Sequence, residues 1–135
     1  MGFNDFYIGQ EATISKAFPF EEVVKFSELS LDRNPIHLDI DYAKNGIFRG
    51  LIVHGFLSSS LISAVIATKL PGPGSIYLSQ ELKFLKPVYH NEEVTSKVRI
   101  IDIKQEKSII ILSTQCFVND IIVIDGKAVV KYVSL

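Results

Sequence analysis

The second half of the chain alternates apolar and polar residues with the two-residue period of β-strands. The stretch 75–84 keeps its apolar residues in one phase, which Gln80 interrupts. Long β-branched runs follow, and the dipeptide Asp125-Gly126 separates the last two of them, which is typical of a hairpin or a bulge. We therefore expect strands at 10–18, 75–84, 93–104, 108–118, 121–124 and 127–133.

Residues 54–70, HGFLSSSLISAVIATKL, are apolar nearly all round and carry many small side chains. A helix of that composition is usually buried, and Pro71 to Gly74 would end it. A shorter helix is expected at 20–29, where two glutamates lie in the first turn. Asn34-Pro35 then ends the regular structure, and 40–45 is expected to form one short helical turn.

These antiparallel strands and one apolar helix predict an α+β fold in which the sheet curls around the helix as a single core. The 135 residues, 47% of them hydrophobic, are enough for one domain spanning 1–135. Because the sheet keeps open edges, pairing of two copies into a homodimer is expected.

Charge and composition exclude several classes of partner. The net charge is −1 with no basic run, which predicts neither nucleic-acid nor membrane binding. Cys116, the single cysteine, lies in a strand pattern and is expected to be a buried, inert thiol. The first residues lack a secretory signal pattern, so a cytoplasmic location is expected, with an organelle matrix left open.

The bend SLDRNPIHLDIDYA places Asp32 five residues before His37 across a stiff Asn-Pro turn. A carboxylate that orients an imidazole is a common acid–base pair near neutral pH. The alternative interpretation is that Asp32 merely forms or caps the turn. Spacing alone leaves both interpretations open.

Gly55 opens the apolar helix, where free backbone N–H groups and the positive helix end attract an anion or a developing oxyanion. A glycine with no role beyond starting the helix is the alternative. Together with the acid–base pair, this helix start makes a coherent site for a polarised carbonyl.

Other chemistries find less support. His37, His54 and His90, with Asp39 and Asp41, lack metal-ligand spacing, so no metal is expected. No nucleophile elbow or phosphate loop is present. The serines at 58–60 are expected to serve helix packing, and His90 is expected to be solvated in a turn.

Three stretches together resemble the (R)-specific enoyl-CoA hydratases of the MaoC-like dehydratase family: DRNPIH at 32–37, IVHG at 52–55 and GSIYLSQELKFLKPV at 74–88. The resemblance implies the hot-dog fold, a curved antiparallel sheet wrapped around one long central helix, usually as a homodimer. It also implies reversible syn hydration of a trans-2-enoyl thioester to the (R)-3-hydroxyacyl thioester. The coenzyme A or carrier arm belongs to the substrate, and no cofactor is required.

By this resemblance, Asp32 and His37 form the catalytic dyad, and the N–H of Gly55 is the oxyanion donor. Ser63 resembles a serine found near the family's dyad. The segment before His54 lacks a proline that many relatives carry. Phe56 stands where methionine is common, and this bulky residue is expected to reshape the acyl pocket and chain-length preference.

Three alternatives accompany this prediction. A 3-hydroxyacyl-carrier-protein dehydratase would dock its carrier on a basic rim, for which Lys44, Arg49, Lys83 and Lys86 are candidates. A hot-dog thioesterase is disfavoured by the Asp-x-Asn-Pro-x-His turn. A non-catalytic acyl-thioester binding module has no sequence feature in its favour, since both dyad residues are present.

Overall fold

A five-stranded antiparallel sheet, in the order β1-β3-β4-β5-β2, is the framework of the computed structural model, which describes residues 2–134. The α+β prediction is confirmed, and the arrangement is the hot-dog fold that the resemblance implies. The strands are β1 (Glu11–Ala17), β2 (Ser75–Phe84), β3 (Glu93–Lys104), β4 (Ile109–Val118) and β5 (Ile121–Tyr132).

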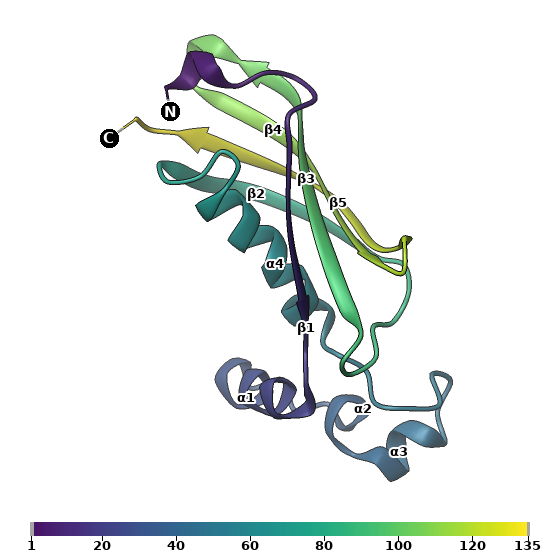
Figure 1. Ribbon diagram of the computed structural model, residues 1–135. Coiled ribbons are helices and arrows are strands. Elements are labelled where there is room, and N and C mark those ends of the chain that lie inside the picture. The colour runs from purple at the N-terminus through teal and green to yellow at the C-terminus, as the bar shows by residue number, and fades with distance from the viewer. Residues whose placement is uncertain (1, 135) are drawn as a thin grey trace.

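The long helix α4 (Gly55–Thr68) lies along one face of the sheet (Figure 1). The central strands β3 and β4 bury every second residue over most of their length, most regularly in β4. Burial of this apolar layer is the main stabilising contribution, at about 25 cal/mol per Å². Its largest fully buried side chains on the helix and the central strands are Ile62, Val65, Ile66, Val94, Val98, Ile100, Ile110 and Leu112.

The helix is not buried all round in the single chain, so that expectation is wrong. One face packs on the sheet through residues such as Leu61 and Val65. The opposite face, which includes Phe56, Ser60 and Ser63, is exposed. An apolar helix with an open face has hydrophobic surface left for another partner.

The expected break at Asp125-Gly126 is also wrong, because both residues lie inside the single strand β5. Gly126 pairs with Leu82 of β2 on one side and with Thr114 of β4 on the other. A side chain on Gly126 would place its Cβ 1.9 Å from the Glu81 carbonyl oxygen. The glycine therefore allows close approach of two strands and does not make a turn.

Gln80 reaches across this glycine to a polar partner on the far strand. Its Nε2 donates to Thr114 Oγ1 at 2.8 Å, and its Oε1 accepts from the Tyr77 hydroxyl. A bulge at Leu78 puts Tyr77 and Gln80 on the same face, which a regular strand would not do. Burial raises the pKa of Tyr77 to about 12, so the hydroxyl keeps its proton and donates. This network accounts for the polar residue that interrupts the apolar phase of 75–84.

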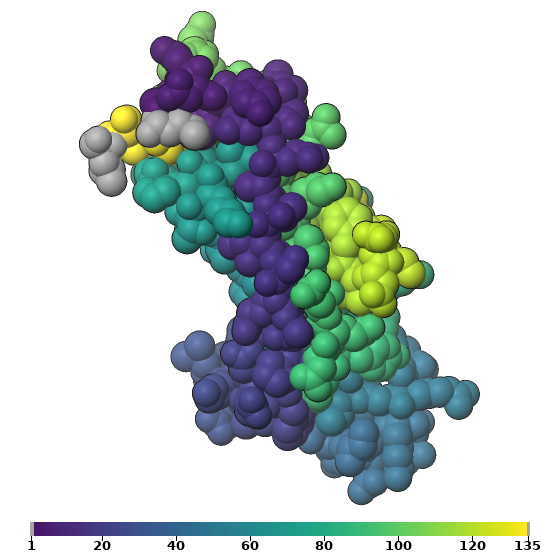
Figure 2. Space-filling model, in the orientation of Figure 1, coloured from purple at the N-terminus to yellow at the C-terminus, as the bar shows by residue number. Residues whose placement is uncertain are grey.

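Three short helices gather at one end of the sheet, away from both termini (Figures 1 and 2). They are α1 (Phe20–Ser30), α2 (Pro35–Leu38) and α3 (Ile40–Lys44). Single 3₁₀ turns, η1 (Phe3–Asp5) and η2 (Gln105–Lys107), complete the elements. Within the described part of the chain, no helix is long and apolar enough to cross a membrane.

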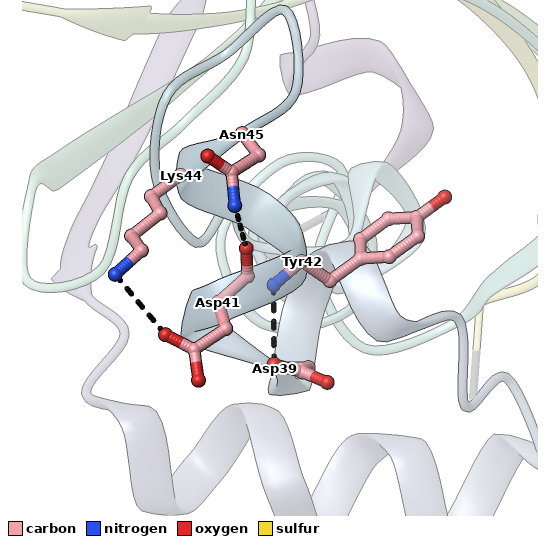
Figure 3. Close-up of polar contacts among 5 residues, drawn as sticks. All are labelled: Asp39, Asp41, Tyr42, Lys44 and Asn45. Carbon is pink, nitrogen blue, oxygen red and sulfur yellow. Dashed lines mark hydrogen bonds and ion pairs between the residues drawn. The ribbon is translucent and has the colours of Figure 1, made fainter.

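The helix α3 is held by local polar contacts (Figure 3). Asp39 caps its start by accepting from the Tyr42 N–H at 3.2 Å, and Asn45 donates to the Asp41 carbonyl at 2.8 Å. Lys44 pairs with Asp41 at 3.1 Å. Such caps contribute about 1 kcal/mol each, which helps a five-residue helix to form at its predicted place.

Cys116 is fully buried on β4, as its strand pattern predicts. Burial raises the pKa of its thiol to about 11. The group therefore stays protonated near neutral pH and is a poor nucleophile.

Candidate active site

The bend that carries Asp32 is built from backbone and side-chain contacts over a few residues. Leu31 ends α1 in the left-handed conformation, with φ 68° and ψ 6°. Asp32 Oδ1 then accepts from the Asn34 N–H at 3.3 Å, and Asn34 Oδ1 accepts from the Ile36 N–H at 3.2 Å. Pro35 occupies the first turn of α2, where its missing N–H costs nothing. These contacts fix the direction in which the chain leaves Asp32.

His37 is 8% exposed and lies on α2. Its Nδ1 lies 2.9 Å from the Ile52 carbonyl oxygen. Because a carbonyl can only accept, Nδ1 carries the hydrogen and donates it. The neutral ring therefore has its lone pair at Nε2, which is the nitrogen left to act as a base.

Asp32, His37 and His54 lie together. One carboxylate oxygen and one ring nitrogen from each histidine are all within 4.8 Å of one another. A single water molecule can bridge groups at that separation. The structure thus brings together the two residues of the expected dyad, although their catalytic roles stay predictions.

His54, which the sequence indicated only as a weak metal-ligand candidate, is 1% exposed at the start of α4. Its Nε2 lies 3.1 Å from the Asp32 carbonyl oxygen and 3.0 Å from Ser27 Oγ on α1. Its ring stacks on that of His37, with centroids 3.8 Å apart, and meets the edge of Phe26. Burial lowers the pKa of His54, against the smaller opposing effect of the Asp32 carbonyl.

His90 lies in a turn, as expected, but it is half-buried, so the expectation that its side chain is solvated is wrong. Its ring packs against Phe20 with centroids 5.2 Å apart, and its Nε2 is buried without a partner among residues 2–134. Burial lowers the pKa of His90, and the nearby His37 lowers it further. All three histidines of the chain thus lie around the bend.

The geometry does not favour a metal ion on this cluster. The rings of His37 and His54 are stacked and inclined by 27° to each other. Lone pairs of nearly parallel rings do not converge on one ion, and each ring already directs one nitrogen at a backbone carbonyl. Hydrogen bonding within the protein is the better explanation of the cluster.

A cavity of about 300 Å³ opens beside the dyad. It is lined by Asp32, by His54 to Phe56 at the start of α4, and by residues 84–88 after β2. Among the described residues, neither the Gly55 nor the Phe56 N–H has a hydrogen-bond partner. Free amides at the positive end of a 14-residue helix therefore face a largely apolar cavity.

Gly55 also has a packing role. A Cβ at this position would lie 2.5 Å from a ring carbon of Phe84. The Phe84 ring stacks edge-on against Phe56, with centroids 5.7 Å apart. The absence of a side chain lets this aromatic pair cover the helix start while the amides stay open to the cavity.

Of the two remaining predicted site residues, Phe56 lines this cavity and Ser63 does not. Phe56 is 67% exposed and lines it, so its expected influence on the acyl pocket stays a prediction. Ser63 lies eight residues beyond Gly55, about 12 Å along the helix, on the exposed face. The single chain does not place Ser63 in the cavity lining.

Comparison with known proteins gives consistent matches. Residues 6–115 match the MaoC like domain family. The chain is 41% identical to an (R)-specific enoyl-CoA hydratase of Rhodospirillum rubrum, over 95% of this chain and 89% of that protein. It is 35% identical to a mitochondrial 3-hydroxyacyl-(acyl-carrier-protein) dehydratase of Arabidopsis thaliana, over 90% of this chain and 74% of that protein. Among solved structures, an (R)-hydratase from A. caviae involved in PHA biosynthesis matches with a TM-score of 0.92 and 42% identity, over 95% of this chain and 98% of that one.

Proposed function

Since the chain belongs to the MaoC-like dehydratase family, we propose that it catalyses the reversible hydration of trans-2-enoyl thioesters to (R)-3-hydroxyacyl thioesters. The observation that carries the proposal is the cavity that Asp32 and Gly55 both line, with a ring nitrogen of His37 within 4.8 Å of an Asp32 carboxylate oxygen just outside the lining. Adding water to a double bond involves no net change of oxidation state, so the reaction needs no redox cofactor, and the coenzyme A or carrier arm belongs to the substrate.

In the proposed mechanism, one water molecule lies between Asp32 and His37. Nε2 of His37 takes one proton from the water, and the Asp32 carboxylate accepts a hydrogen bond from the O–H that remains and holds the oxygen in place. The water oxygen bonds to C3, and the electron pair of the double bond moves to C2 and the thioester oxygen. The proton then passes from Nε2 to C2 on the same face, which gives syn addition.

The start of α4 would stabilise the intermediate charge. Negative charge grows on the thioester oxygen when the water adds, and the Gly55 N–H can donate to it. Preorganised donors of this kind contribute roughly 10²- to 10³-fold to the rate in other enzymes. The helix end adds a partial positive charge at the same place.

A direct assay tests this proposal. We expect the protein to remove the enoyl absorbance of crotonyl-CoA and to give a product that an (R)-specific 3-hydroxyacyl dehydrogenase oxidises. Release of free thiol instead would indicate a thioesterase. Tight binding of the thioester without turnover would indicate a binding module, and either result would overturn the hydratase proposal.

The carrier-protein dehydratase remains a second candidate, because the plant relative is named for that reaction and the chemistry is the same in reverse. Of the candidate basic residues, Lys86 lines the cavity, and Lys44, Arg49 and Lys83 are exposed. Comparing kcat/KM for coenzyme A and carrier-protein thioesters of equal acyl length separates the two substrates.

We further propose that two copies pair through the β2 edge. That edge exposes Ile76 and Leu78, beside the open apolar face of α4, whereas the other edge, β1, exposes polar residues such as Thr13 and Lys16. An apolar edge strand is a ready template for a second copy, and a two-fold pair would cover it. The pairing would also cover Ser63.

Leu78→Asp is expected to convert the dimer into a monomer, because pairing through this edge would bury one unpaired carboxylate from each copy. Light scattering coupled to gel filtration measures the change. Ile8→Asp, at another exposed apolar position before β1, is the matched control and should leave the dimer intact. A monomeric wild-type protein at micromolar concentration would contradict this proposal.

A further inference from the structure

His54 links three parts of the candidate site that are separate along the chain. Its Nε2 contacts the backbone carbonyl of Asp32, and its ring stacks on the ring of His37. Its peptide leads directly into Gly55, and its own carbonyl accepts the first hydrogen bonds of α4. No other residue within 2–134 makes contact with both members of the dyad and also starts the helix.

The hydrogen bonds define one protonation form of this side chain. The Asp32 carbonyl can only accept, so Nε2 of His54 carries a hydrogen and donates it, with Ser27 Oγ as a second acceptor. Nδ1 is buried without a partner among the described residues. A hydrogen there would be a buried, unsatisfied donor on a charged ring, which is costly. The ring is therefore neutral, with its lone pair at Nδ1.

We propose that His54 is a positioning residue, which as a neutral ring holds the Asp32 backbone and the face of His37 in register with the Gly55 amide. It does not touch the substrate in this role. The Nε2–H donor fixes the carbonyl end of Asp32, and the stacked ring limits the tilt of His37. Ser27 completes the arrangement by tying His54 to α1. The inference rests on the proposed function, because register matters only if the dyad and the amide act on one substrate.

Two variants separate the donor from the ring. His54→Gln keeps an N–H at nearly the Nε2 position but loses the ring, and His54→Phe keeps the ring but loses the donor. Loss of register by about 1 Å can reduce kcat roughly 10²-fold. We expect that loss in His54→Phe, a clearly smaller one in His54→Gln, and KM within threefold of wild type in both. Equal kcat for folded His54→Phe and wild type would overturn the proposal.

A measurement on the wild-type protein keeps the proposal testable if either variant fails to fold. Nitrogen-15 NMR of the histidine rings reports tautomer and charge directly. We expect His54 to stay neutral with the hydrogen on Nε2 from pH 8 to pH 6, and His37 to carry its hydrogen on Nδ1 when neutral. A charged His54, or one with the hydrogen on Nδ1, would overturn the positioning role.

Different results would overturn the hydratase proposal and the positioning role of His54. If wild-type protein turns over neither thioester, the proposed function is wrong whatever the ring spectra show. If wild-type protein is active and His54→Phe is equally active, the hydratase proposal stands and the role of His54 is wrong. Circular dichroism melting of each variant identifies losses of activity that come from unfolding alone.

Discussion

Asp32→Asn is expected to lower kcat for crotonyl-CoA hydration roughly 10²- to 10⁴-fold, with KM nearly unchanged. The amide keeps the shape of the carboxylate and an oxygen that can accept from the Asn34 N–H, so the bend is preserved. Asp32 is exposed, and removing its charge costs little stability. What the variant loses is the negative group that holds the water against His37.

The matched control for this prediction is Asp41→Asn. Asp41 lies on the adjacent α3, and within residues 2–134 its carboxylate pairs only with the exposed Lys44, so its loss should change kcat by less than twofold. Initial rates by loss of enoyl absorbance and melting curves are measured for both variants. If Asp32→Asn stays folded and keeps more than a tenth of the wild-type kcat, Asp32 is not a member of the dyad.

Gly126→Ala is expected to destabilise the protein by about 3 kcal/mol, which lowers Tm by about 10 °C. In an ordinary strand the same change is favourable by about 0.5–1 kcal/mol, because alanine loses less backbone freedom on folding. Here the new Cβ would lie 1.9 Å from the Glu81 carbonyl oxygen. That oxygen belongs to the backbone of β2, so relief requires the two strands to separate.

Gly46→Ala is the control with the opposite sign. A Cβ at Gly46 would meet its nearest neighbour, the Ala43 carbonyl oxygen, at an ordinary 3.5 Å. We expect this variant to be as stable as wild type or up to about 1 kcal/mol more stable. Urea unfolding gives both free energies, and a Gly126→Ala variant within 1 kcal/mol of wild type would show that β2 and β5 are not so closely packed.

The strands at 75–84, 93–104 and 108–118 were predictable because a two-residue alternation is a local and repeated signal. The predicted break at Asp125-Gly126 is wrong for a physical reason. Its turn preference is local, whereas partners on both sides of β5 hold the extended backbone. The helix α2 was missed because Asn34-Pro35 also makes a good helix start, with Asn34 as the cap and Pro35 in the first turn.

The residues of the candidate site also divide into those that the local sequence predicts and those that only tertiary packing brings together. Asp32 and His37 are five residues apart on one bend, so their proximity follows from local geometry alone. The environment of His54 depends on Ser27, Phe26 and His37, which only the packing of α1 against the start of α4 brings together. No spacing rule indicates such contacts, although a histidine before a glycine-started apolar helix is a usable signal.

The order of these residues along the chain has a consequence for how the protein can change. The acid–base pair, the histidine behind it and the open helix amide lie between Ser27 and Gly55, whereas one wall of the cavity comes from Phe84 to Val88 and from Ile124. Substitutions in that later wall can remodel the space for a substrate tail while the acid–base pair and the helix start keep their own residues. Evolution can therefore retune selectivity and retain the reaction, and a library confined to the wall positions is the natural route for engineering it.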